Sequence, residues 1–177
     1  MNNILSLLRP LSPKTFDVNE YFVITIMLLV WGIFFLLHKK ERLLLHTEII
    51  AIITFNVFFA TVGDRILAEP PLDFYDTVDY AHGEFFDSIL QVLVYPIPIL
   101  ISIHFYRKFK PNKVVYVILW AGILSVLEWI SERFFNVFQY NHWHILLSFC
   151  FYLFAIFVNL SLSNKINKMI RSKSSTT

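Results

Sequence analysis

Five long apolar runs occupy most of the chain, and short polar segments separate them. An apolar helix of about 20 residues crosses the hydrocarbon core of a bilayer. The alternation therefore predicts an all-α fold, a polytopic membrane helical bundle with five transmembrane helices. The helices are expected over about residues 21–38, 43–66, 85–106, 114–138 and 143–163.

Composition leaves no room for a large soluble part. Hydrophobic residues make up 56% of the 177 positions, the mean hydropathy is +0.60, and 16% of the residues are charged. Ordinary soluble domains carry about 25% charged residues. The net charge of +2 gives no reason to expect nucleic-acid binding. The expected partner is the lipid bilayer, and a protein partner or a homo-oligomer is left open.

Basic residues are distributed unevenly between the two sets of connections. The turn after the first run, the turn after the third run and the C-terminal tail hold 11 of the 15 lysines and arginines. Because short cytoplasmic connections are enriched in Lys and Arg, we predict the N-terminus outside and the C-terminus inside. Residues 1–20 would form an extracytoplasmic segment, residues 21–163 the transmembrane domain, and residues 164–177 a basic cytoplasmic tail. The expected location is the cell (plasma) membrane, as a multi-pass protein.

Two local signals refine this arrangement. Pro96 and Pro98 lie within the third run, and proline has no N–H to complete the preceding turn. A kink is therefore expected near residues 91–95. The acidic connection between the second and third runs is expected to form a short amphipathic helix over residues 73–87.

Polar side chains from three runs reach one depth near the expected outer surface. Glu128 and Glu132 are four residues apart, so they share one face of the fourth helix. An ionisable residue inside a membrane helix usually faces a partner or a water-filled cavity. We therefore predict a polar cavity formed by Asp64, Arg65, Asp87, Gln91, Glu128, Glu132 and Arg133.

Two interpretations of Glu128 remain open from sequence. In the first, Glu128 forms a buried ion pair with Arg65 or Arg133 that fixes the fourth helix to a neighbour. In the second, it has no cationic partner and handles protons or cations together with Glu132. The distinction is whether Glu128 meets an arginine or faces empty polar space.

Other ionisable residues have simpler explanations. His142 and His144 lie in an aromatic turn typical of membrane interfaces. A zinc site needs three or four ligands, so no metal is expected there. Glu48, near the inner end of the second run, is expected to extend towards Arg42 or to pair with His46.

No catalytic signature is present. The chain contains no G-x-S-x-G, H-E-x-x-H or C-x-x-C motif and no glycine-rich phosphate loop. We therefore predict no catalytic residues and no cofactor. An enzyme is the less expected outcome.

A motif at the end of the fourth run carries a family resemblance. Leu127 and Glu128 are followed by Glu132-Arg133, and then by Phe138-Gln139-Tyr140 and Trp143, while Tyr95-Pro96 lies in the third run. Over residues 85–145 the chain resembles a family of small uncharacterised five-span integral membrane proteins of spore-forming bacteria. The resemblance implies a bacterial protein with this topology. It implies no activity and no catalytic residue.

Three functions fit the sequence. The first is a non-enzymatic envelope protein whose polar network near the outer face is structural or binds a partner. The alternative is a small proton- or cation-coupled transporter, channel or sensor that uses Glu128 and Glu132. A second alternative is an intramembrane enzyme that acts on a lipid. A dry and fully paired network favours the first function, whereas an outward cavity that reaches Glu128 favours the others.

Overall fold

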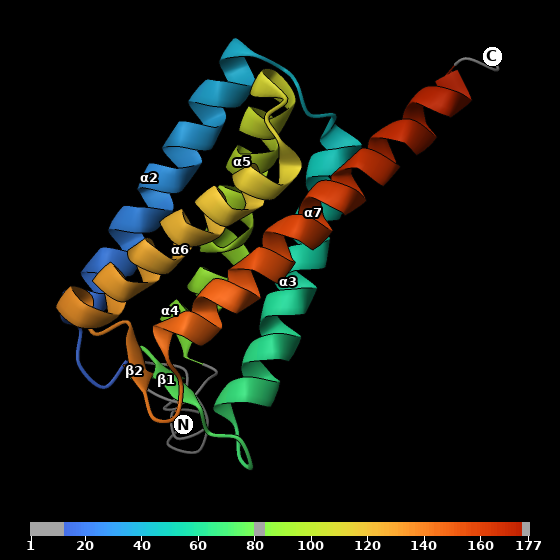
Figure 1. The fold of residues 1–177 in the computed structure, drawn as a ribbon. Helices are drawn as coiled ribbons and strands as arrows, with labels where there is room; N and C mark the ends of the chain where they lie inside the picture. Colours follow the sequence, from blue (N-terminus) through green and yellow to red (C-terminus); the bar gives the residue numbers. More distant parts are fainter. Residues whose placement is uncertain (1–12, 80–83, 175–177) are drawn as a thin grey trace, which may run out of the picture.

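The computed structural model of this protein describes residues 13–79 and 84–174, and in them five long helical segments alternate in direction (Figure 1). Each segment is long and apolar enough to cross a membrane, so the expectation of five such helices is confirmed. The third segment is divided into a short helix, a π-helical turn and a second helix. The segments are α2 (Val18–Lys40), α3 (His46–Ala68), α4 (Phe85–Ile89) with η2 (Leu90–Val94) and α5 (Pro96–Phe109), α6 (Lys113–Phe135) and α7 (Ile145–Ser174).

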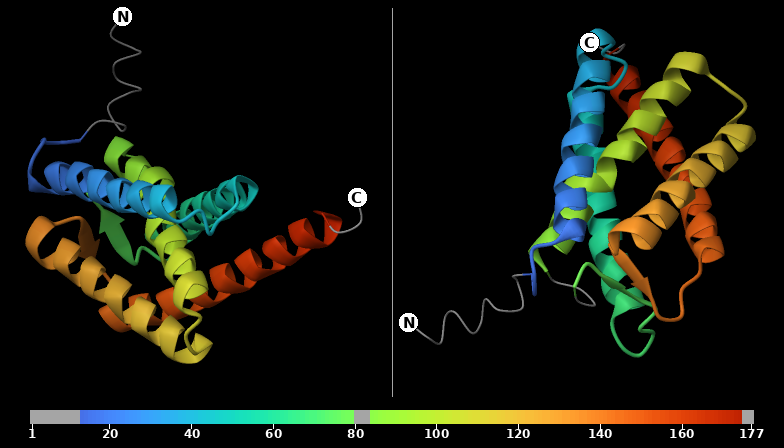
Figure 2. Two further views of the ribbon diagram at one scale, coloured as in Figure 1. Left: turned by 90° about the horizontal axis from the view of Figure 1, so that it is seen from above. Right: turned by 90° about the vertical axis from the view of Figure 1, so that its left-hand side faces the viewer.

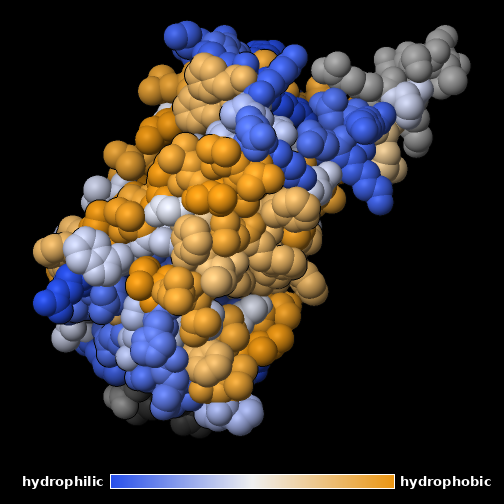
Figure 3. Space-filling model, in the orientation of Figure 1, coloured by the Kyte–Doolittle hydropathy of each residue, from blue (hydrophilic) through white to orange (hydrophobic). Residues whose placement is uncertain are grey.

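The outside of the bundle is apolar between two polar ends. Figure 3 shows a hydrophobic band across the middle of the molecule, with hydrophilic residues gathered above and below it. Large side chains such as Leu28, Phe58 and Leu146 are at least 64% exposed. Water would penalise such a surface by about 25 cal/mol per Å², whereas hydrocarbon tails accept it. The described residues therefore present the surface of a multi-pass membrane protein.

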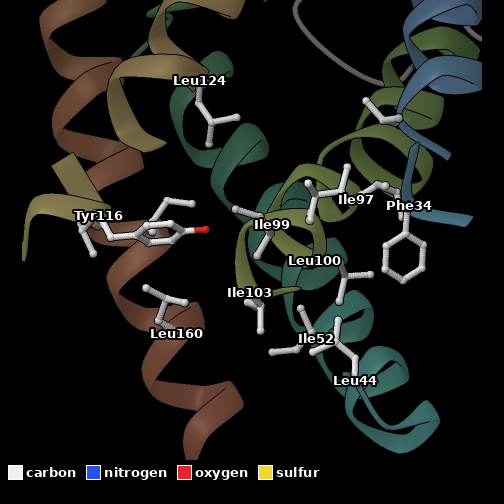
Figure 4. Packing of buried hydrophobic residues seen from close by; sticks show 14 residues of the cluster. Phe34, Leu44, Ile52, Ile97, Ile99, Leu100, Ile103, Tyr116, Leu124 and Leu160 are labelled. Atoms are coloured by element: carbon white, nitrogen blue, oxygen red, sulfur yellow. The ribbon is translucent and has the colours of Figure 1, made fainter. Parts of the chain in front are cut away.

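Helix α5 and the two short segments before it form the centre of the bundle. Seen from above, they cross the bundle obliquely, and α5 packs against α2, α3 and α7 (Figure 2). In the most apolar 18 residues of this segment, 61% of the residues are buried, against 11% to 33% in the other four segments. Figure 4 shows Ile97, Leu100 and Ile103 of α5 in a cluster that also includes Phe34 of α2 and Leu160 of α7. Because lipid is as apolar as these side chains, close packing and polar contacts hold the helices together more than removal from water does.

The central span contains one wide turn. The backbone N–H of Tyr95 donates to the carbonyl of Leu90, five residues earlier, at 2.8 Å, which is the π-helical pattern. Pro96 follows directly and has no N–H to offer the turn before it. The indole N–H of Trp31 donates to the carbonyl of Leu93 at 2.8 Å, so α2 supplies a donor to this irregular backbone. The wide turn lies where the sequence predicts a kink.

Two connections pair with each other at one end of the bundle. Strand β1 (Tyr75–Thr77) follows α3, strand β2 (Phe138–Tyr140) follows α6, and the two form an antiparallel ladder. In this register Tyr75 lies opposite Tyr140. We call this end of the molecule the sheet end. The opposite end carries the lysines and arginines of the turns after α2 and α5, and we call it the basic end.

Most predicted helix boundaries lie within three residues of the observed ones, and three differences affect the architecture. The helix expected over residues 73–87 is wrong in its first half, where β1 forms, and α4 begins only at Phe85. Helix α6 ends at Phe135, before the expected residue 138, because Asn136 adopts a left-handed φ of 50° that terminates helices. Helix α7 continues to Ser174, well past the expected residue 163.

The extension of α7 has a simple sequence basis. No proline or glycine occurs between its first and last residues, so nothing in the chain interrupts the helix. Most of the segment expected as a separate basic tail therefore belongs to α7. The first twelve residues of the expected extracytoplasmic segment, and residues 175–177, lie outside the described residues.

Candidate functional site

The carboxylate of Glu128, on α6, is held by three hydroxyl groups. Its Oε1 accepts hydrogen bonds from the hydroxyl of Tyr140 and from Ser148 Oγ, the latter at 2.5 Å, and its Oε2 accepts one from the hydroxyl of Tyr152. Ser148 Oγ in turn accepts the indole N–H of Trp143 at 2.7 Å. Strand β2 and the first turns of α7 therefore supply the donors. These donors are neutral, so they solvate the carboxylate without cancelling its charge.

The expected ion pair between Glu128 and Arg65 or Arg133 is not formed. Arg65 Nε lies 3.2 Å from Glu69 Oε1, one turn along α3, and the Arg65 side chain is 71% exposed. Arg133 is exposed near the end of α6. Among the described residues, Glu128 has no guanidinium or ammonium group within ion-pair distance. The first interpretation of Glu128 is therefore wrong.

A second carboxylate, that of Asp64 on α3, lies at the same end of the bundle. Its Oδ1 accepts the hydroxyl of Tyr75 at 3.1 Å, and its Oδ2 accepts Gln91 Nε2 at 3.0 Å. The same Nε2 lies 3.0 Å from each carboxylate oxygen of Asp87. Because an amide nitrogen carries two N–H groups, Gln91 bridges acidic residues of two different segments. The structure thus brings together Asp64, Asp87 and Gln91.

A cavity of about 160 Å³ is lined by both Asp64 and Glu128. It lies between α3, α5, α6 and α7 towards the sheet end, and both acidic residues are half-buried. No basic residue lines it in the part of the chain that the structure describes. Aromatic rings form much of its wall: Phe59, Tyr75, Tyr95, Phe138, Tyr140, Trp143, Phe151 and Tyr152.

Strand pairing places two of the hydroxyl donors side by side. Tyr75 and Tyr140 are register partners, so their side chains share one face of the two-stranded sheet. Tyr75 donates to Asp64, and Tyr140 donates to Glu128. Burial, and after it the charge of the nearby carboxylates, raises the pKa of both phenols. Both therefore remain protonated donors at neutral pH.

A pair of amides lies on the side of the cavity that faces the basic end. Asn56 Nδ2 donates to Asn159 Oδ1 at 2.7 Å, and Asn159 Nδ2 donates to Asn56 Oδ1 at 3.0 Å. Each amide also donates to the carbonyl four residues earlier in its own helix. Both residues are buried, and of the α3 residues that line the cavity, Asn56 lies furthest from the sheet end. The pair links α3 to α7 on the basic-end side of the cavity.

Several predicted site residues lie apart from the cavity. Glu132 is half-buried and Arg133 is exposed, and neither lines the cavity wall; the same holds for Arg65. Asp87 and Gln91 do not line it either, although Gln91 contacts Asp64. His142 and His144 are exposed in the turn before α7. Within residues 13–79 and 84–174 they form no group of three metal-ligating side chains. The two glutamates four residues apart on α6 therefore do not form one site.

At the basic end, Glu48 forms a buried ion pair that the sequence does not predict. Glu48 is fully buried, and the guanidinium of Arg107 on α5 donates to both of its carboxylate oxygens, one of them at 2.7 Å. Ser163 Oγ donates to the same carboxylate at 2.5 Å. The expected extension of Glu48 towards Arg42 or His46 is wrong, because α5 and α7 cover it.

The sequence contains a partial signal for the hydroxyl donors. Tyr140 and Trp143 belong to the motif that follows the fourth apolar run. Ser148 and Tyr152 are four residues apart, so one face of α7 presents both. Tyr75 has no such signal, since its place depends on the pairing of two distant connections. No family model matches this chain, and no curated protein or solved structure matches it either.

Proposed function

We propose that this chain is a multi-pass protein of the cell membrane that binds a small organic cation in the cavity lined by Asp64 and Glu128. The observation that carries the proposal is the environment of Glu128. Its carboxylate has hydroxyl partners only, and it faces a wall in which no described residue is basic. The sheet end is outside and the C-terminus is inside, because the lysines and arginines gather at the basic end.

The aromatic wall favours a cation that carries apolar groups. A bare metal ion needs several oxygen ligands, and hydroxyl donors already engage both oxygens of Glu128. Each aromatic face attracts an alkylammonium group by about 0.5–2 kcal/mol. At about 160 Å³ the cavity is smaller than the roughly 300–1,000 Å³ of pockets for drug-sized ligands, so the ligand is small.

Named residues have distinct roles in this proposal. Glu128 is the main counter-ion, and Asp64 is a second one. Tyr140 and Tyr152 fix the Glu128 carboxylate from both of its oxygens, and Trp143 offers its ring to the ligand. This function is non-enzymatic, and it gives the polar network a binding role. A lipid-acting enzyme has less support, since no histidine or cysteine is among the described lining residues.

Transport of the same cation is the second candidate. The observation that favours it is the wide turn η2, which lies beside the cavity in the central helix. Transporters often place substrates at interrupted helices. Tyr95, directly after the wide turn, and Pro98, in the first turn of α5, both line the cavity. Uptake of radiolabelled choline into proteoliposomes separates the two candidates. A receptor would bind choline saturably without accumulating it.

Choline and its neutral isostere 3,3-dimethylbutan-1-ol provide a matched pair of ligands for testing cation binding. The purified protein is titrated with each, and quenching of tryptophan fluorescence reports occupancy near Trp143. We expect choline to bind and the neutral alcohol to bind about tenfold more weakly or worse, because only choline has a charge for Glu128 and the rings.

Two variants complete this experiment. Glu128→Gln removes the charge while keeping the shape, and it should reduce choline affinity by about tenfold or more. Glu132→Gln removes a charge one turn away that does not line the cavity, and it should leave the affinity unchanged. Equal binding of choline and the alcohol, or full choline affinity in Glu128→Gln, would rule the proposal out.

A further inference from the structure

We propose a second site, for Ca²⁺, formed by Glu20, Asp79 and Glu84 at the sheet end. The three residues come from separate segments: the first turn of α2, the residues after β1, and the N-cap of α4. One carboxylate oxygen of each lies within 4.8 Å of the other two. None of the three lines the cavity described above, so this site is independent of the proposed function.

Two of these carboxylates are buried and incompletely hydrogen-bonded. Glu20 and Glu84 are both 0% exposed, and among the described residues Oε1 of each has no hydrogen-bond partner. The other oxygen of each is fixed by a backbone N–H, Glu20 Oε2 by that of Asp17 at 2.6 Å and Glu84 Oε2 by that of Asp79 at 3.1 Å. A buried carboxylate oxygen without a donor is costly. The backbone thus holds both groups in place while one oxygen of each remains for a further ligand.

Charge at this cluster is strongly negative. Lys14 donates its backbone N–H to Asp79 Oδ2 and its Nζ to the Asp79 carbonyl oxygen, each at 2.6 Å, so among the described residues one ammonium group accompanies three carboxylates. A bound divalent cation would relieve the repulsion between these groups.

The spacing and the ligand atoms suit Ca²⁺. Oxygen donors select hard cations, and Ca²⁺ accepts six to eight oxygens at about 2.3–2.6 Å in flexible geometry. Two oxygens on one Ca²⁺ can therefore lie up to about 4.8 Å apart, which agrees with the separation of the three carboxylates. Mg²⁺ requires shorter distances and a strict octahedron, so it is the poorer fit. A bound Ca²⁺ would tie the start of α2 to β1 and α4.

The test measures binding and stability on the purified full-length chain after treatment with EDTA. Equilibrium dialysis with ⁴⁵Ca²⁺ should give one ion per chain, and excess Mg²⁺ should displace it poorly. Thermal unfolding followed by tryptophan fluorescence should show a rise of several degrees in Tm with millimolar Ca²⁺, because a ligand that binds only the folded state stabilises it.

Matched variants locate the ion. Glu20→Gln/Glu84→Gln should lose both ⁴⁵Ca²⁺ binding and the Tm rise, and in EDTA it should melt no lower than wild type, because two buried charges are gone. Glu132→Gln, at the same end but outside the cluster, should behave as wild type. Wild-type protein that binds no ⁴⁵Ca²⁺ would overturn the proposal whether or not the double variant folds. A folded double variant with wild-type binding would overturn it as well.

Discussion

At the scale of single residues, two glutamates on one helix meet different surroundings. Four residues along an α-helix correspond to a shift of about 6 Å and a rotation of about 40°. Glu128 faces α7 and β2, where hydroxyl groups surround it. Glu132 lies beyond the cavity and is half-buried. The position of the neighbouring elements, more than the shared helix face, decides the environment of each carboxylate.

Glu128→Gln should lower the free energy of unfolding by about 1–2 kcal/mol. The amide keeps one acceptor oxygen where the carboxylate has two, so one tyrosine hydroxyl must reorient and accept from the new NH₂ group. Glu132→Gln should change stability by less than about 0.5 kcal/mol. Thermal unfolding of both variants in the same detergent measures the difference. Indistinguishable melting of the two variants would contradict this ranking.

The sequence predicts which ionisable residues approach one depth, but it does not predict their partners. Asp64 and Asp87 could be selected because each lies within about one turn of the end of an apolar run, and Gln91 because it lies one turn after Asp87. One of the two interpretations gives Glu128 an arginine partner, Arg65 or Arg133, yet Arg65 contacts Glu69. Charge balance favours an arginine as the partner of Glu128, whereas in the structure tyrosine and serine hydroxyl groups donate to its carboxylate. The pattern of polar and apolar residues does not show which hydroxyl group of a distant strand will bind a given carboxylate.

At the scale of elements, the pair Glu48–Arg107 joins α3 to α5, and Ser163 adds α7 to it. Arg107→Gln should therefore destabilise the bundle by about 3–5 kcal/mol, because it leaves the fully buried Glu48 without its cation. Glu48→Gln in the same chain should recover part of the loss, as coupled neighbours do in a double-mutant cycle. Purely additive effects on unfolding would argue against the pair.

Glu41–Lys108 supplies a matched control at the same end. Its two side chains are 30% and 34% exposed, so solvent screens their attraction. The hydrogen bond from Lys108 lowers the pKa of Glu41. Lys108→Gln should nonetheless cost far less stability than Arg107→Gln. A comparable loss would show that burial is not what distinguishes the two pairs.

The amide pair of Asn56 and Asn159 gives a second test between elements. Asn56→Leu leaves the Asn159 amide without its side-chain partner and should cost about 1 kcal/mol. Asn56→Leu/Asn159→Leu replaces both amides by apolar groups of similar size and should be more stable than the single variant. A double variant that melts below Asn56→Leu would refute this view of the pair.

The existence of the five long helices was predictable from the sequence, whereas the residues at which they end were not. The five apolar runs have the length of a membrane span, so their helices follow from hydropathy alone. The end of α6 depends on the left-handed conformation of Asn136. The strand after it depends on a partner strand whose paired residues lie 61 to 65 positions earlier in the chain, as from Phe138 to Thr77. Local propensity does not determine such long-range contacts.

At the scale of the whole molecule, the proposed orientation has a direct test. In a Cys150→Ser background, single cysteines are placed at Leu72, which is 38% exposed at the sheet end, and at Ser172, which is exposed near the end of α7. An impermeant thiol reagent applied to intact cells should label Leu72→Cys. Ser172→Cys should react only after the membrane is permeabilised. The opposite labelling pattern would show that the proposed orientation is wrong and that the sheet end lies inside.

The register of the small sheet has a consequence for both acidic residues of the cavity. Side chains alternate between the two faces of a strand, so a slip by one residue turns every side chain to the opposite face. Because Tyr75 and Tyr140 are on opposite strands, a slip of β1 would turn Tyr75 away from Asp64, and a slip of β2 would turn Tyr140 away from Glu128. Six residues in two connections thus set the solvation of two charges inside the bundle.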